Sequence, residues 1–431
     1  MNPLLRRAAP LFALLFFAVP LSAQDDVFRV IHAGWVLDVP GEAPRTDASI
    51  LIRGERIESI RDGFVTPSGA EVIDLRDHYV MPGFIDSHVH LSNELGPDRA
   101  FEALRSNDAD VALDAARAAR VTLMSGFTAA QDVGNGLAVA TAIRDAINAG
   151  DVPGPRLRVS GPAVSPTGGH GDVNGLALDV MDVRTNRYAC DGPADCRRAV
   201  RELVRGGADV IKITATGGVL SNTAAGVEQQ FFDDELASIV EAARMMGRRV
   251  TAHAHGATGI NSFLRAGGAS IEHSTYLDDE SIRLFLETGA YMVPTILAGV
   301  TVAEIATQED WMPAAIREKS LTVGPQIQGS LRRAHAAGVK IAFGTDSGVS
   351  MHGQNAREFQ LMVEAGMTPM EALHSATVVA SEHIQMDADI GTLEAGKFAD
   401  LVATAANPLD DVAVLMDIRF VMKGGTIYKG N

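Results

Sequence analysis

Cysteine is scarce in this chain of 431 residues, which contains only Cys190 and Cys196. Two cysteines alone cannot supply the four ligands that a structural zinc site needs. Both lie in one short stretch, "YACDGPADCRR", and such a pair can oxidise if the protein is exported. We therefore expect a local disulfide, with two free thiols as the alternative.

Runs of basic residues are also missing, as are low-complexity tracts and internal repeats. The chain carries 37 Lys and Arg against 54 Asp and Glu, a formal net charge of −17. An acidic chain without basic clusters is unsuited to binding nucleic acid or an anionic membrane surface. We therefore expect neither a nucleic acid nor a membrane surface as partner.

The N-terminal apolar run from Leu11 to Val19 is shorter than the roughly 20 residues that a membrane-spanning helix needs. Arg6 and Arg7 precede it and Leu21–Ala23 follow it, so residues 1–23 are typical of a secretory signal peptide. The arginine pair also allows a twin-arginine route, and a membrane anchor is the alternative reading. We expect an exported protein, periplasmic or secreted, without a stable membrane anchor.

The two ends of the remaining chain show the same sequence pattern. Residues 24–80 contain short alternating strands, such as "ASILIRGERIESI", in which a polar turn separates two hydrophobic runs. Residues 391–431 look similar, with Gly424-Gly425 as a turn. We expect both ends to form one small composite β-sandwich domain.

Residues 81–390 instead alternate apolar strands with helices, which indicates a parallel α/β architecture. The predicted strands are "GFIDSHVHL", "GFTAAQDV", "RLRVSGP", "DVIKITAT", "RVTAHAHG", "SIEHST", "YMVPTI" and "KIAFGTDS". Eight strands predict a (β/α)8 TIM barrel, whose active site lies at the carboxyl ends of the strands. A doubly wound open sheet is the alternative, but it would need a phosphate-binding glycine turn, and no G-x-G-x-x-G occurs.

Histidines and acids fall at the ends of the predicted strands. The positions concerned are His88 and His90, His253 and His255, Glu272 and His273, and Thr345 and Asp346. The two H-x-H pairs have the period of a strand, so both imidazoles of a pair share one face. Each signal alone has an ordinary structural explanation, but a barrel would gather them in one ring. Imidazole and carboxylate are ligands for zinc or a similar ion.

Lys212 lies in the middle of the strand "DVIKITAT", where β-branched residues occupy both faces. Burial disfavours the ammonium form of lysine, and a neutral amine can add carbon dioxide to form a carbamate. A carbamate is anionic and has two oxygens, so it could bridge two metal ions. The alternatives are a lysine that reaches the barrel rim and one that pairs with a carboxylate.

Five motifs together resemble the metal-dependent amidohydrolase superfamily, over essentially the whole chain after the signal. They are "PGFIDSHVHL", "VIKI", "AHAHG", "IEHS" and "FGTDSG". The segments "TGGHGD", "GGVLS" and "HGQNAREF" resemble the imidazolonepropionase-like and prolidase-like branch. The spacings from Lys212 to His253 and on to His273 are similar to those in ochratoxin-hydrolysing amidohydrolases.

The resemblance implies a centre of two divalent metal ions, with zinc as the default. By analogy His88 and His90 would hold one ion with Asp346, His253 and His273 would hold the second, and a carbamate on Lys212 would bridge them. Asp346 would also move the proton to the leaving amine. His170 would polarise the scissile carbonyl, and His255 would contact a substrate carboxylate.

The resemblance further implies an amidohydrolase or carboxypeptidase-like enzyme, which would cleave N-acyl amino acids or dipeptides with a hydrophobic C-terminal residue. Ochratoxin A, cleaved to ochratoxin α and phenylalanine, is one candidate substrate. Val219 and Leu220, with Ile296 and residues 311–312, could line an apolar pocket or simply pack. The alternatives are an Xaa-Pro dipeptidase, a cyclic-amide hydrolase or a non-catalytic assembly protein on the same fold. Relatives in this branch suggest a homo-oligomer.

Overall fold

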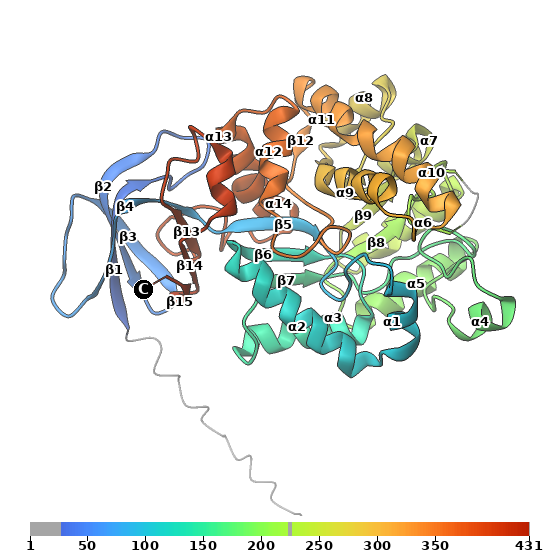
Figure 1. Ribbon diagram of the computed structural model, residues 1–431, viewed down its shortest axis with the longest axis horizontal. Coiled ribbons are helices and arrows are strands. Elements are labelled where there is room, and N and C mark those ends of the chain that lie inside the picture. The colour runs from blue at the N-terminus through green and yellow to red at the C-terminus, as the bar shows by residue number, and fades with distance from the viewer. Residues whose placement is uncertain (1–26, 223–225, 431) are drawn as a thin grey trace, which may run out of the picture.

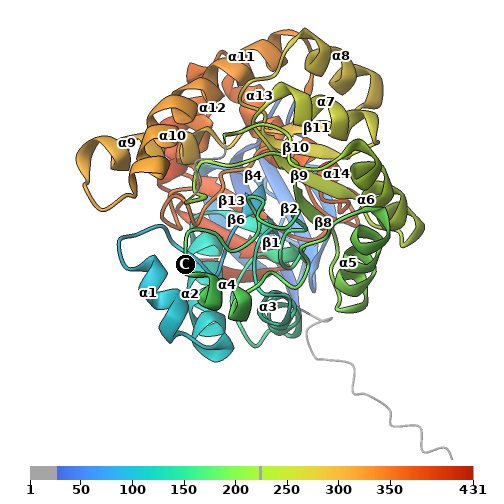
Figure 2. The same cartoon turned by 90° about the vertical axis from the view of Figure 1, so that its right-hand side faces the viewer.

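The computed structural model describes residues 27–222 and 226–430; the predicted signal peptide lies outside them. A sheet at one end adjoins a larger strand-and-helix unit (Figure 1). Seen along the long axis, helices form a ring around the strands of the larger unit (Figure 2). Among the described residues, no helix has the length and apolar character needed to cross a membrane.

The smaller unit is a seven-stranded sheet with the order β15-β14-β13-β4-β1-β2-β3. Its strands are β1 (Phe28–Val36), β2 (Arg45–Arg53), β3 (Arg56–Asp62), β4 (Glu71–Pro82), β13 (Leu401–Thr404), β14 (Phe420–Lys423) and β15 (Thr426–Lys429). Strands from both ends of the chain meet where β4 pairs with β13, with Pro82 opposite Leu401. Alternating side chains such as Ile31 and Ile50 build a core of its own.

The larger unit contains eight parallel strands. They are β5 (Phe84–Val89), β6 (Phe127–Asp132), β7 (Arg156–Val159), β8 (Ile211–Thr214), β9 (Val250–Ala254), β10 (Ser270–His273), β11 (Tyr291–Val293) and β12 (Lys340–Ile341). They form runs of three and five strands. Parallel bridges from Val89 to Ser347 and from Val164 to Ile213 join the two runs on both sides. The predicted (β/α)8 barrel with a small β unit is therefore confirmed.

Helices follow the strands around the barrel. They are α1 (Arg99–Arg105), α2 (Asp108–Met124), α3 (Leu137–Ala149), α4 (Leu178–Val183), α5 (Pro193–Arg205), α6 (Asp233–Met245), α7 (Ala257–Arg265), α8 (Asp279–Thr288), α9 (Ile296–Gln308), α10 (Ala314–Val323), α11 (Ile327–Ala336), α12 (Arg357–Glu364), α13 (Pro369–His374) and α14 (Ala380–His383). Local signals set several ends: Asn107 caps α2 through the backbone N–H of Ala109 and Asp110, and Gly289 ends α8 with φ 70°.

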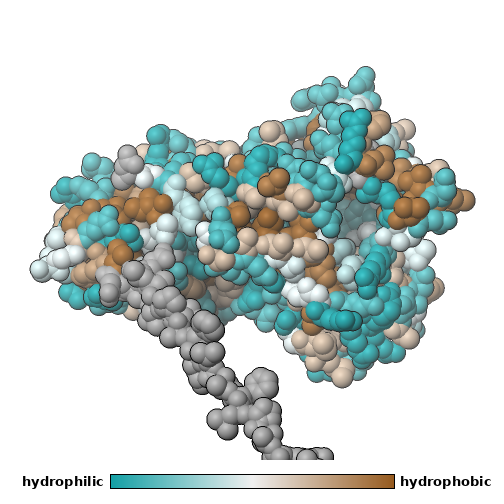
Figure 3. Space-filling view, turned by 90° about the horizontal axis from the view of Figure 1, so that it is seen from below, coloured by the Kyte–Doolittle hydropathy of each residue, from teal (hydrophilic) through white to brown (hydrophobic). Residues whose placement is uncertain are grey.

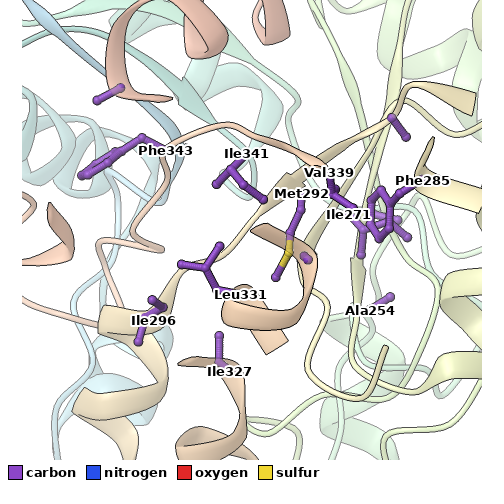
Figure 4. Close-up of a cluster of buried hydrophobic side chains, with 14 of the residues drawn as sticks. Ala254, Ile271, Phe285, Met292, Ile296, Ile327, Leu331, Val339, Ile341 and Phe343 are labelled. Carbon is purple, nitrogen blue, oxygen red and sulfur yellow. The ribbon is translucent and has the colours of Figure 1, made fainter. Parts of the chain in front are cut away.

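The main core lies between the barrel strands and the surrounding helices. Ile271 and Met292 from the strands pack with Phe285 of α8 and Leu331 of α11 (Figure 4). Burial of such large apolar side chains contributes about 1.5–3 kcal/mol each. This packing holds the strand ends, and therefore the residues that follow them, in fixed positions.

Cys190 and Cys196 form a disulfide, as predicted from their spacing. The bridge joins the segment after α4 to the first turn of α5. The backbone N–H of Cys190 also donates to the carbonyl of Ser165 at 2.9 Å. The disulfide thus closes a short loop, between residues six positions apart, within the connection between β7 and β8.

Candidate metal centre

The carboxyl ends of the barrel strands bring two groups of ligand-type side chains together. The first group is His88, His90 and Asp346, and the second is His253, His255 and His273. Within each group, one ligand atom per residue lies within 4.8 Å of the others. The groups adjoin, because the ring centroids of His88 and His273 are 5.5 Å apart.

The first group is built from β5 and the segment after β12. His88 Nε2 and His90 Nε2 lie 3.3 Å and 3.1 Å from Asp346 Oδ1. The backbone N–H of Asp346 donates to the carbonyl of His88 at 2.8 Å, which fixes the two strand ends side by side. Two imidazoles and a carboxylate that converge in this way are a suitable donor set for a divalent metal ion.

Asp86, which the sequence analysis did not single out, supports this first group. Its carboxylate accepts hydrogen bonds from the backbone N–H of His88 at 3.1 Å, the hydroxyl of Thr345 at 2.6 Å and the side-chain amide of Asn355 at 2.8 Å. Complete burial raises the pKa of Asp86 to about 6, although the bonds from Thr345 and Asn355 oppose this shift. Asp86 therefore ties β5 to the segment that follows β12.

Two histidines of the second group are oriented through one ring nitrogen each. His273 Nδ1 lies 2.6 Å from Thr295 Oγ1, and His253 Nε2 lies 3.3 Å from the carbonyl oxygen of Gly217. Bonds of this kind fix the tautomer and leave the other nitrogen of the ring as a lone-pair donor. Both side chains are therefore oriented as metal ligands usually are.

His255 belongs to the second group by geometry, although we predicted a substrate contact for it. Its ring stacks on that of His273 with centroids 4.9 Å apart, and its Nδ1 lies 2.7 Å from Thr275 Oγ1. The structure thus places His255 within reach of an ion held by His253 and His273. Its role as a substrate contact stays a prediction.

Burial keeps these imidazoles neutral. It lowers the pKa of His255 to about 3, and it lowers the pKa values of His253 and His273 well below their usual range. Burial acts to raise the pKa of Asp346, but His88 and His90 beside it hold that pKa well below its ordinary value. Neutral imidazoles and an ionised carboxylate are the protonation states that bind metal.

Lys212 lies in β8 and is buried, with 3% of its surface exposed. Its Nζ is 2.7 Å from Glu272 Oε2, and Thr251 donates a hydrogen bond to the other carboxylate oxygen. Burial acts to raise the pKa of Glu272, but the charge of Lys212, together with that of His88 and the hydrogen bonds from Lys212 and Thr251, lowers the pKa overall. Pairing with a carboxylate was one of the alternatives for Lys212, and Glu272 is that carboxylate. The carbamate stays a prediction.

His170 reaches the second group from the connection after β7. Its ring centroid is 4.3 Å from that of His253, and its Nδ1 is hydrogen-bonded to the hydroxyl of Ser221. Burial, aided by the charges of Lys319 and Lys212, lowers the pKa of His170 to about 4. The structure thus brings His170 to the metal groups, as expected for a residue that contacts substrate.

The residues predicted to line an apolar pocket do not all lie together. Val219 is buried in a cluster with Val302 of α9 and Val323 of α10, and Leu220 packs against this cluster. Ile296 instead lies in the main core beside Ile327 (Figure 4). We therefore remove Ile296 from the predicted pocket, because its surroundings are those of a packed core residue.

Arg99, at the start of α1, was missed from the sequence because nothing in its neighbourhood marks it. Burial lowers the pKa of Arg99, and the charge of Asp346 acts in the opposite direction, so the guanidinium lies within electrostatic reach of the first group. Across residues 27–222 and 226–430, no hydrogen bond or ion pair engages its side chain.

These donor groups at the end of a barrel define a hydrolase site of a known class. The model of the Amidohydrolase family matches residues 79–428. The chain belongs to this family, whose members generally use a binuclear divalent metal centre, and it is a hydrolase that acts on amide bonds.

Among curated proteins, the chain is similar to an ochratoxinase of Aspergillus niger, with 34% identity over 95% of this chain and 88% of the relative. Among solved structures, it resembles a Xaa-Pro dipeptidase with bound methionine, with 42% identity and a TM-score of 0.89 over 94% of this chain and all of that one. A prolidase complexed with N-methylphosphonate-L-proline matches with 33% identity and a TM-score of 0.86 over 94% of this chain and 100% of that chain.

Proposed function

We infer that this enzyme hydrolyses the amide bond of N-acyl amino acids or dipeptides whose C-terminal residue is hydrophobic and carries a free carboxylate. Ochratoxin A, which would yield ochratoxin α and phenylalanine, is one candidate substrate. The similarity to an ochratoxinase and to a dipeptidase that binds methionine supports this class. Ochratoxin A and dipeptides both contain an amide bond beside an amino acid carboxylate.

Arg99 is the observation that carries the proposal. A half-buried guanidinium without a described partner is unfavourable unless an anion joins it, because burial of an unpaired charge is costly. A carboxylate is the anion that a guanidinium binds best, through two parallel hydrogen bonds. His170 and His255, which like Arg99 lie within electrostatic reach of Asp346, are the further substrate contacts that we propose.

In the proposed centre, His88, His90 and Asp346 would hold one divalent ion, and His253 and His273 would hold the second. A carbamate on Lys212 would supply a further anionic ligand shared by the two ions, and zinc is the expected metal. Such ions lower the pKa of bound water toward about 7 and polarise a carbonyl group. His170, a neutral hydrogen-bonding group, would orient the scissile carbonyl oxygen. Asp346 would accept a proton from the attacking water and release it to the leaving amine.

A second candidate activity is that of an Xaa-Pro dipeptidase. The solved dipeptidase with 42% identity favours it, as does the prolidase that binds a proline phosphonate. The two candidates differ at the leaving group, which is a secondary amine in Xaa-Pro and a primary amine in the other substrates. Val219 and Leu220 are the apolar residues that we propose to distinguish them.

A panel of substrates tests the proposal. It contains N-acyl phenylalanine and methionine, ochratoxin A, Xaa-Pro dipeptides, a cyclic amide, and the C-terminal amide of each linear compound. We expect the free acids to be hydrolysed roughly 10- to 100-fold faster than their C-terminal amides, the size of one lost charged hydrogen bond. Equal rates for acid and amide would contradict recognition of the carboxylate.

Arg99→Leu sharpens the same experiment. It should raise KM for the free acids and leave the C-terminal amides nearly unaffected. Arg105→Leu is the matched control, because Arg105 is exposed at the other end of α1. An equal loss on acids and amides would show that Arg99 does not bind the carboxylate.

We further propose that residues 1–23 direct export and that the protein is a homo-oligomer. The mass of the exported chain and light scattering of the purified protein test these two points. An uncleaved chain retained in the cytoplasm, or a monomeric mass, would contradict them.

A further inference from the structure

Helices α9 and α10 lie in the connection between β11 and β12, and α10 reaches across to the segment 217–222 that follows β8. Lys319 of α10 donates hydrogen bonds from Nζ to the carbonyl oxygens of Gly218 at 2.9 Å and Ser221 at 2.8 Å. Gly218 and Ser221 lie 101 and 98 positions earlier in the chain. Charged donors make hydrogen bonds about twice as strong as neutral ones.

Segment 217–222, which Lys319 binds, also contacts the His170 side chain. Ser221 forms the side-chain hydrogen bond to His170 Nδ1. A Cβ atom at Gly218 would lie 2.3 Å from the His170 ring, so the ring packs directly against that glycine. The position of the imidazole therefore depends on where Gly218 and Ser221 lie.

Apolar packing reinforces the same junction. Val219, between the two bonded carbonyls, packs with Val302 of α9 and Val323 of α10. Lys319 is also close enough for its charge to lower the pKa values of His170 and His255. Thus α10 contacts the segment both through Lys319 and through its apolar face.

We propose that Lys319 is a positioning residue, which fixes segment 217–222 and, through Ser221 and Gly218, holds the His170 imidazole where it orients the scissile carbonyl. This inference rests on the proposed role of His170. Without Lys319 the segment would shift relative to His170, and a displacement of about 1 Å in a positioning group can lower a rate about 10²-fold.

The test compares Lys319→Met with Lys319→Arg, and uses Lys340→Met as the control because Lys340 is exposed at the start of β12. Lys319→Met should lower kcat roughly 10- to 100-fold and change KM much less, although Val219 and Leu220 lie in the same segment. Lys319→Arg, which keeps the charge and several donors, should recover most of kcat. Hydrogen exchange of the amides of residues 217–222 should quicken in Lys319→Met and not in Lys340→Met.

A double-mutant cycle with His170→Ala separates positioning from a general loss of stability. If Lys319 acts through His170, Lys319→Met should cost almost nothing further in the His170→Ala background. Independent losses that multiply, or unchanged exchange of residues 217–222, would overturn the inference. The cycle is measured with whichever amide the wild type cleaves. If no free acid is hydrolysed, the proposed substrate class is refuted. The hydrogen exchange and the cycle still decide whether Lys319 positions His170.

Discussion

Lys212 and Glu272 form a buried ion pair, and the cost of such a pair bears on how the metal centre assembles. Removing two charges from water costs several kcal/mol per ion, which their attraction offsets only when the geometry is good. A carbamate on Lys212 would place a second anion beside Glu272. The nearest imidazoles are neutral, so they would supply no positive charge to offset the two anions. Two divalent ions would supply the missing positive charge, so carbamate and metal should be gained or lost together.

Lys212→Ala should therefore lose metal. Elemental analysis of the purified protein should find far fewer than the two ions per chain expected for the wild type. Lys212→Ala also leaves Glu272 buried without its partner, which costs about 3–5 kcal/mol of stability. The double variant Lys212→Met/Glu272→Gln avoids this cost, because it removes both charges. Two ions per chain in either variant would refute the bridge.

Asp346→Asn tests the proposed proton transfer. General acid–base catalysis is typically worth about 10²–10⁴-fold, so kcat should fall by this range while KM changes little. Asp62→Asn serves as the control, because Asp62 is largely exposed at the end of β3. Turnover near that of the wild type in Asp346→Asn would exclude Asp346 as the proton carrier.

At the scale of single elements, the start of α9 connects the core to the metal centre. The backbone N–H groups of Ile296 and Leu297 donate to the Glu358 carboxylate at 2.9 Å and 2.7 Å. Thr295, directly before them, bonds His273 Nδ1 and has a left-handed φ of 54°. Glu358 thus anchors the helix end whose preceding residue orients a proposed ligand.

Glu358 gives a prediction about pH. Burial raises the pKa of Glu358 from 4.5 to about 8, so the folded protein keeps a proton that the unfolded chain has already released. The wild type should therefore lose stability relative to Glu358→Gln as the pH rises from about 4.5 to 8. Denaturant unfolding of both proteins across this window measures the difference; a pH-independent difference would contradict it.

The disulfide gives a second prediction for an element, the connection between β7 and β8. Cys190→Ser/Cys196→Ser should lower the free energy of unfolding by about 2 kcal/mol, as closure of a short loop predicts. A reductant should destabilise the wild type and have no effect on this variant. Equal stability of the wild type with and without reductant would mean that the bridge contributes nothing.

Much of the barrel could be predicted because each strand shows its own signal. Apolar runs such as "VIKITA" are long enough to mark buried strands, and histidines directly after them point to the catalytic end. No bounds were predicted for individual helices, and short ones such as α1 and α4 are the hardest to predict, since helices of this length are stable only with tertiary contacts. The pairing of Lys212 with Glu272 and the contacts of Lys319 join distant parts of the chain, which a local pattern does not reveal.

At the scale of the whole molecule, the exposed apolar side chains bear on the proposed homo-oligomer. Hydrophilic residues cover much of the face in Figure 3, and hydrophobic residues lie there in separate patches. The exposed apolar side chains include Leu178 of α4, 76% exposed, and Val183, 85% exposed. Such patches are compatible with contacts between copies in the proposed homo-oligomer.

In the proposed centre, two metal ions and a carbamate on Lys212 would join His88, His90, Asp346, His253 and His273 into one site. Anomalous diffraction at the zinc edge, from crystals of the protein purified without chelator, tests this proposal. We expect two anomalous peaks, one in each group of ligands, and additional density on Lys212 Nζ. Absent peaks, or peaks elsewhere with an unmodified Lys212 still paired with Glu272, would contradict it.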